Sequence, residues 1–183
     1  MPNRRPLAPG RRFGPYVIEE HVGTLAGADL YRAEQPSLHR LVTLTVLPPE
    51  EGAKPVLKQR FDRQALAASK VRHPNVVAAL DAGSIAGHAY IVSEDVGGRG
   101  LSDLLDAGEW IGTRRAVTIA LGIARALHHL ETVGVLHRAV TPECILLGEA
   151  VIPKLRGFSF SRPHRGAASE TWFEADDRSA LYT

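Results

Sequence analysis

The chain has 183 residues, of which 44% are apolar and 23% are charged, and its formal net charge is +2 with histidine counted as neutral. This composition is that of a globular protein and excludes wholesale disorder, and the length predicts one domain or a small two-lobed one. The near-zero net charge argues against bulk nucleic-acid binding, and the single cysteine, Cys144, excludes an internal disulfide framework and a four-cysteine zinc site.

The N-terminal stretch, residues 1–12, is basic and contains no acid; its arginines are Arg4, Arg5, Arg11 and Arg12. No apolar core follows these arginines, so the stretch does not have the pattern of a signal peptide. We predict a flexible basic arm. Nowhere does the chain hold a run of about 18 apolar residues, so we expect no membrane segment and a cytoplasmic protein.

The region from residue 16 to residue 47 has the pattern of β-strands. Residues 16–18 and 30–33 predict two strands, with Gly23 and Gly27 turning the chain between them. Residues 41–47 are a β-branched run that Pro48 and Pro49 stop. Alternation along this run places three apolar side chains on one face: Val42, Leu44 and Val46.

Helical spacing begins at residue 54. Leu57, Phe61, Ala65 and Ala68 form one stripe over residues 54–70, and Gln64 lies on the same side. The predicted helix ends before the His73-Pro74 pair, because a residue that precedes proline resists the helical conformation.

The rest of the chain contains mainly helix with short strands. Residues 76–80 and 89–92 predict strands, and residues 97–100 predict a mobile connector. Residues 101–133 predict helix, with a periodic apolar set in the second part: Val117, Ala120, Leu121, Ala124, Leu127 and Leu130. Short strands at 144–147 and 151–155 follow. A strand-rich half with one helix and then a helical half predict an α+β fold with segregated lobes.

Five segments, in order, make the chain resemble a bacterial eukaryotic-like Ser/Thr protein kinase. Residues 22–33 correspond to the glycine-rich loop, and residues 40–47 correspond to the third strand. Residues 61–77 correspond to the αC helix with its following turn, residues 134–147 to the catalytic loop, and residues 154–159 to the D-F-G segment. The resemblance implies a bilobal kinase-like fold, with the β-rich N-lobe at residues 13–96. It implies a partial C-lobe at residues 97–183, ending at the start of the family's αF-type helix.

The residues that carry chemistry in that family are substituted. By the resemblance, Thr45 stands in place of the third-strand Lys and Gln64 in place of the αC Glu. In the catalytic loop, Ala139 replaces the catalytic Asp, Thr141 replaces the Lys two residues after it, and Cys144 replaces the metal-binding Asn. Gly157 replaces the Asp of D-F-G. Ala139 cannot accept a proton, and neither Cys144 nor Gly157 suits Mg²⁺. We therefore expect no metal site, no required cofactor, and weak or absent binding of ATP with Mg²⁺.

By the resemblance, Thr45 and Gln64 replace both partners of the family's Lys–Glu ion pair. Removing one partner of a buried ion pair leaves an uncompensated charge, and replacing both partners with neutral side chains avoids that cost. A hydrogen bond between Thr45 and Gln64, direct or through water, is expected.

The resemblance also implies a vestigial adenine pocket. Its candidate residues are Val22, Gly23, Leu30, Thr43, Ser93, Glu94, Val96 and Leu146. Two alternatives remain at this point: the pocket is open, or neighbouring side chains fill it. His137 and Phe158 are expected to be structural and to join the apolar spine of the family with Ala68.

The favoured hypothesis is a pseudokinase that acts as a protein-interaction or regulatory module. A protein partner would cover the incomplete C-lobe, where the helix at 114–133 would otherwise expose apolar surface. One alternative is a residual ATP-binding kinase of low activity that uses unconventional residues, such as Asp95, Asp103, Glu143 or Lys154. Another is a non-functional truncated remnant.

Overall fold

A computed structural model of the chain describes residues 6–25, 27–148, 152–158 and 162–163. Its strands are β1 (Arg12–Phe13), β2 (Tyr16–Leu25), β3 (Ala28–Gln35), β4 (Arg40–Leu47), β5 (Ala79–Ile85), β6 (His88–Glu94), β7 (Arg99–Gly100), β8 (Val135–Leu136), β9 (Ile145–Leu147), β10 (Pro153–Leu155) and β11 (Arg162–Pro163). Its helices are α1 (Pro49–Gly52), α2 (Pro55–Ser69), α3 (Leu101–Asp106) and α4 (Thr113–Thr132), with 3-10 turns η1 (Pro36–Leu38) and η2 (Pro142–Cys144).

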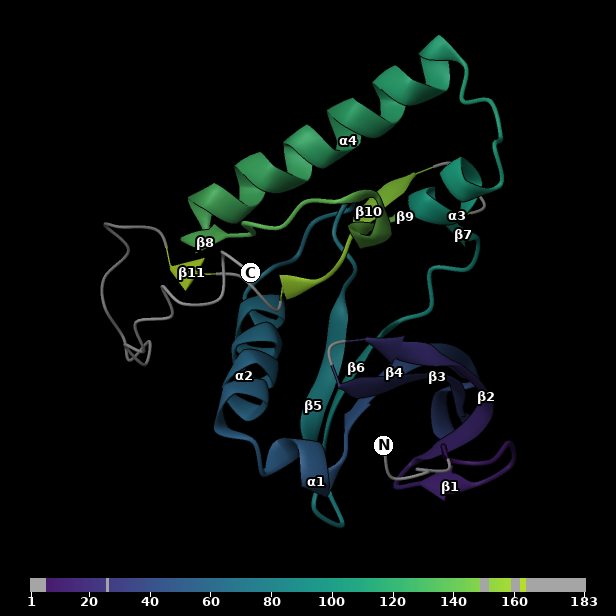
Figure 1. The fold of residues 1–183 in the computed structure, drawn as a ribbon, viewed down its shortest axis with the longest axis vertical. Coiled ribbons are helices and arrows are strands. Elements are labelled where there is room, and N and C mark those ends of the chain that lie inside the picture. Colours follow the sequence, from purple (N-terminus) through teal and green to yellow (C-terminus); the bar gives the residue numbers. More distant parts are fainter. Residues whose placement is uncertain (1–5, 26, 149–151, 159–161, 164–183) are drawn as a thin grey trace.

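The first lobe is a curled antiparallel sheet with α2 beside it (Figure 1). The strand order is β1-β2-β3-β4-β6-β5, so β4 lies in the interior of the sheet. The predicted alternation in β4 is confirmed, because Val42, Leu44 and Val46 are fully buried in one core cluster with Tyr16 and Tyr31. The opposite face of β4 is therefore directed toward the second lobe and forms part of the site described below.

The second lobe consists of small sheets beneath the long helix α4. Strands β10, β9 and β7 form one sheet, and β8 pairs with β11. Figure 1 shows α4 at the far end of the molecule from the large sheet. The α+β bilobal prediction is confirmed. Among the described residues, no helix combines the length and apolar character that crossing a bilayer requires.

Three local predictions need correction in the first lobe. Gly23 does not turn the chain, because it lies within β2 opposite Leu30. Residues 7–12 of the predicted flexible arm lie on the sheet: Leu7 N–H donates to Tyr31 Oη at 3.1 Å, and Gly10 N–H donates to Ile18 O at 2.8 Å. The strand predicted at 76–80 instead begins at Ala79 and runs to Ile85, with only an isolated bridge from Val76 to Leu155 before it.

The predicted connector at 97–100 is also not wholly irregular. Arg99 and Gly100 form β7, which pairs with β9 and ties the connector to the second lobe. The short helix α1 was not predicted. Its two prolines, Pro48 before the helix and Pro49 at its first turn, suit a helix start because the N–H groups there have no intrahelical acceptor.

Helix α4 is apolar on two faces, and the prediction identified mainly the outer one. Its buried residues are Ile119, Gly122, Ile123, Ala126 and Leu130. Of the predicted stripe, Leu130 is buried, while Val117 and Leu121 are 60% and 48% exposed. A Cβ on residue 122 would collide with the ring of Pro153, so glycine lets α4 approach β10 closely. The exposed apolar surface predicted for the helix at 114–133 is therefore present.

Candidate functional site

A cleft lies where the large sheet, α2 and the strands β9 and β10 meet. It encloses about 90 Å³. Its walls are formed by Leu25, Ala28, Leu30, Thr43, Thr45, Leu47, Leu57, Arg60, Phe61, Gln64, Val77, Ser93, Glu94, Leu146, Arg156 and Gly157. Pockets for drug-sized ligands usually measure about 300–1,000 Å³, so neighbouring side chains largely fill this one. Of the two alternatives for the pocket, the filled one fits the structure better.

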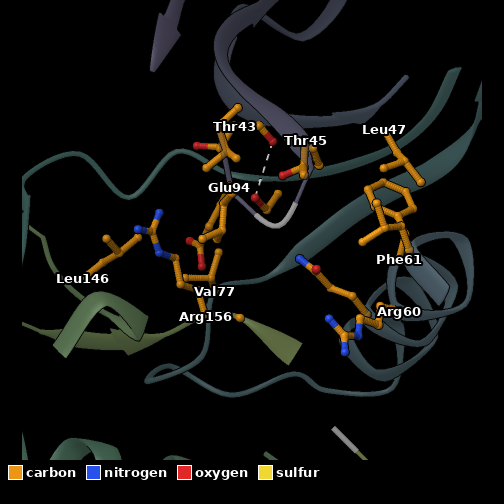
Figure 2. A pocket seen from close by; sticks show the side chains of 16 residues that line it. Thr43, Thr45, Leu47, Arg60, Phe61, Val77, Glu94, Leu146 and Arg156 are labelled. Carbon is orange, nitrogen blue, oxygen red and sulfur yellow. Dashed lines mark hydrogen bonds between the residues drawn. The ribbon is translucent and has the colours of Figure 1, made fainter. Parts of the chain in front are cut away.

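Strand alternation explains the sheet side of the cleft. Because Val42, Leu44 and Val46 point into the sheet core, Thr43, Thr45 and Leu47 point to the other face and line the cleft (Figure 2). Helix α2 supplies the wall opposite β4. Gln64 follows Arg60 by one helical turn, which places both side chains on the same face.

Glu94 at the end of β6 is held by an ion pair with Lys154 of β10. Lys154 Nζ donates to Glu94 Oε1 at 2.7 Å, and Ala78 N–H donates to the same oxygen at 2.8 Å. Both side chains of the pair are less than a third exposed. This contact connects the two lobes and neutralises the carboxylate at the edge of the cleft.

Two arginines bring positive charge to the cleft. Arg156, directly after β10, extends its guanidinium toward Leu146, and Arg60 lies on the α2 side near Phe61 (Figure 2). Arg156 Nε–H donates to Glu143 O at 3.2 Å. The sequence predicted no cation here, because neither arginine occupies a position where the resembled family uses one.

Three of the other positions that the resemblance predicts to be substituted, Ala139, Thr141 and Gly157, lie around Cys144. Cys144 Sγ donates to Ala139 O at 3.4 Å and accepts from Thr141 Oγ1 at 3.6 Å. A Cβ on residue 157 would lie 3.1 Å from the same sulfur. The neighbouring Thr141 side chain lowers the pKa of the exposed Glu143 carboxyl. The cluster contains a thiol, a hydroxyl and backbone groups, whereas Mg²⁺ prefers several oxygen ligands.

His137 lies at the base of this cluster and is structural. It is 3% exposed, its ring meets Phe158 edge-on at 5.4 Å, and its Nε2–H donates to Arg156 O at 3.0 Å. Burial lowers the pKa of His137, because the interior disfavours the charged imidazolium. Phe158 and Ala68 belong to the same core cluster, as predicted.

The structure gathers five of the eight predicted pocket residues into the cleft: Leu30, Thr43, Ser93, Glu94 and Leu146. Val22, Gly23 and Val96 do not line it, and the Val22 side chain is 59% exposed on β2. Thr45, Gln64 and Gly157 line the same cleft. The hydrogen bond between Thr45 and Gln64 stays a prediction.

The unconventional residues of the alternative hypothesis are held in separate contacts. Asp95 accepts from Arg32 Nε at 2.9 Å, Asp103 accepts from Gly100 N–H at 2.9 Å, and Lys154 pairs with Glu94. In the part of the chain that the structure describes, no three His, Cys, Asp or Glu side chains are grouped so that they could hold a metal ion.

A family model for the protein kinase domain matches residues 16–176. The chain belongs to the protein kinase family. It is 32% identical over 153 residues to serine/threonine-protein kinase PknD of Mycobacterium tuberculosis, covering 84% of this chain and 23% of that protein. It is 33% identical over 138 residues to serine/threonine-protein kinase PknE of the same species, covering 75% of this chain and 24% of that protein. The chain thus spans about a quarter of the length of these relatives.

A solved structure agrees with this membership. The M. tuberculosis PknI kinase domain superposes with a TM-score of 0.72 at 25% sequence identity, over 84% of this chain and 62% of that one. Protein kinases catalyse phosphoryl transfer mainly by positioning the nucleotide and neutralising its charge with Lys and metal ions. Thr45, Gln64 and Gly157, which the resemblance predicts at three of these positions, line the cleft between the lobes.

Proposed function

We propose that this kinase-family domain does not transfer phosphate by the route of its family and acts as a protein-interaction or regulatory module. One observation carries the proposal: the three substituted positions that line the cleft, Thr45, Gln64 and Gly157, offer no ammonium and no carboxylate. The family's other catalytic groups are absent as well, since Ala139 has no proton acceptor and Cys144 is a soft ligand that suits Mg²⁺ poorly.

The size of the cleft supports the same proposal. A nucleoside triphosphate with Mg²⁺ needs far more space than about 90 Å³, so binding would require the lobes or the lining side chains to move. The ion pair between Glu94 and Lys154 opposes such a movement, because it connects β6 of one lobe to β10 of the other. Weak or absent binding of ATP with Mg²⁺ is part of this proposal.

The test is phosphate transfer from radiolabelled ATP to a generic acceptor protein, with Mg²⁺ and separately with Mn²⁺, using the full chain. The relative named serine/threonine-protein kinase PknE serves as the positive control. We expect incorporation no higher than in a blank without protein. Incorporation well above the blank that Glu143→Gln or Lys154→Met abolishes would establish the residual kinase and overturn the proposal.

A protein partner is the second part of the proposal, and the outer face of α4 supports it. Val117 and Leu121 lie on the side of α4 away from the buried Ile119 and Ile123, and large apolar side chains grouped in this way favour association. Placing a photo-crosslinking residue at position 117 in the full chain, expressed in its own cell, should capture one discrete partner. The matched control is position 114, on the same helix, and equal capture at both positions would contradict the proposal.

A further inference from the structure

The segment between α2 and β5 joins the first lobe to the second. Val76 forms a bridge with Leu155 of β10, and Val77 N–H donates to Leu155 O at 2.9 Å. Asn75, which is 8% exposed, adds two contacts: its Nδ2–H donates to Pro153 O at 2.9 Å, and its backbone O accepts from Leu155 N–H at 2.8 Å. The position of Asn75 therefore determines how firmly this segment is held on β10.

His73 holds the backbone of Asn75 through a contact that depends on protonation. Asn75 N–H donates to His73 Nδ1 at 3.1 Å. This hydrogen bond requires that Nδ1 carries no proton, so the neutral imidazole has its proton on Nε2. An imidazolium donates from both nitrogens, and its formation would therefore break the bond and deprive Asn75 N–H of its acceptor.

The surroundings of His73 disfavour a positive charge. Its ring stacks on that of His129 from α4, with ring centres 5.1 Å apart. Burial, followed by the effects of His129, Arg125 of α4 and Lys154 of β10, lowers the pKa of His73. The carboxylate of Glu94 on β6 is already bound to Lys154 at 2.7 Å. Among the described residues, neither imidazole forms an ion pair with a carboxylate that would stabilise its charge.

We propose that His73 is an acid-sensitive latch between the two lobes: a proton on its Nδ1 releases Asn75 from β10 and lets the lobes separate. The pKa of His73 is lowered in the closed state, whereas the separated state regains the ordinary pKa of histidine, about 6.5. Acid therefore favours the separated state below pH about 6.5. The ratio of separated to closed molecules should rise by up to about tenfold for each pH unit, because one proton is taken up.

The test measures the distance between the lobes by double electron–electron resonance. Spin labels are placed at two exposed positions, Lys58 on α2 and Thr118 on α4, in the full chain with Cys144→Ser. The distance between these labels should increase from pH 7.5 to pH 5.5. A second pair of labels, at Lys58 and the exposed Glu20, lies within the first lobe and should keep its distance. An unchanged second distance separates lobe opening from global unfolding.

A variant that cannot take up the proton is the decisive comparison. His73→Asn keeps a side-chain acceptor for the N–H two residues later but does not titrate in this pH range, so its 58–118 distance should not change with pH. His128→Asn is the matched control, since His128 is an exposed neighbour of His129, and it should respond as the unmodified chain does. If His73→Asn does not fold, His73→Ser offers a hydroxyl acceptor for the same N–H and should give the same result.

This inference goes beyond the proposed function and can fail separately from it. It is overturned if the 58–118 distance is the same at both pH values, if the His73 variants respond as the unmodified chain does, or if both label pairs change together. Phosphate transfer by the chain would overturn the proposed function and leave the latch intact. Conversely, lobes that are insensitive to acid would leave the proposed non-catalytic function unaffected.

Discussion

Cys144 Sγ occupies the space that a side chain at Gly157 would need, since a Cβ on residue 157 would lie 3.1 Å from it. Gly157 also has a φ of 90°, in the left-handed region that favours glycine. The two residues are therefore coupled in space: the thiol of Cys144 fits beside position 157 because glycine has no side chain.

This coupling leads to the first prediction. Gly157→Ala should lower the free energy of unfolding by about 1–3 kcal/mol, from backbone strain together with the contact on Cys144 Sγ. In the double variant with Cys144→Ala, the loss should be smaller than the sum of the two single losses, because the sulfur is gone. Urea unfolding of the four proteins measures this, and strict additivity would show that Cys144 does not crowd residue 157.

The second prediction concerns the ion pair between the lobes. Lys154→Met leaves the largely buried Glu94 without its cation, and we expect a loss of about 1–2 kcal/mol in the free energy of unfolding. The control is Lys58→Met. Lys58 pairs with Asp62 at 2.5 Å on the exposed side of α2, where such a pair contributes less than about 0.5 kcal/mol. Equal losses in the two variants would show that the Glu94–Lys154 contact behaves as an ordinary surface pair.

The third prediction tests the close approach of α4 to β10. Gly122→Ala should destabilise the fold by about 1–3 kcal/mol, although alanine is the better helix former, because the new methyl group meets Pro153 and Asn75 Nδ2. Gly52→Ala is the matched change, since its nearest neighbouring atom would be 3.9 Å away. Thermal unfolding should show a lower midpoint for the first variant and an unchanged or higher one for the second.

The fourth prediction is a loss of stability in mild acid. Burial lowers the pKa of His137, and burial together with His129, Arg125 and Lys154 lowers the pKa of His73. His73 also stacks on His129 of α4, with ring centres 5.1 Å apart. The folded state therefore disfavours protonation of both imidazoles. In the unfolded chain, each imidazole binds a proton near the usual pKa of histidine, about 6.5.

The sign follows from proton linkage. The unfolded state binds more protons below pH about 6.5, so stability is complete above that value and falls as the pH falls toward the lowered pKa values. Denaturant unfolding at pH 7.5 and pH 5.5 should show this decrease, and His137→Gln should reduce its slope. A free energy of unfolding that does not change between these two pH values would contradict the assignment of His137 and His73 as neutral in the folded state.

Much of the fold was predictable because its signals are local. The alternation of Val42, Leu44 and Val46 predicted the buried face of β4, and the spacing of Phe61 and Ala68 predicted α2. Boundaries were predicted less well. The prediction did not identify the full extent of β5, Ala79–Ile85, for two reasons. Most side chains of this strand are exposed, and Gly83 and Ser84 within it are residue types typical of turns.

The site was predictable only where its residues occupy positions of a known pattern. Thr45, Gln64 and Gly157 were identified in this way, and the structure brings all three to the cleft. Arg60 and Arg156 were missed, because an arginine on a helix or after a strand usually lies in solvent. For Arg60, the spacing could have indicated a place in the cleft, because Arg60 precedes Gln64 by one helical turn.

The sequence by itself determined the α+β order of elements and which residues stand at the positions where the resembled family is expected to carry its ammonium and carboxylate groups. Both depend on residue identity and short-range periodicity, which can be read along the chain. Only the tertiary structure decided that Glu94 binds Lys154, that Cys144 fills the space beside Gly157, and that two arginines enter the cleft. These contacts join residues far apart in the chain, and their geometry is set by how the two lobes pack.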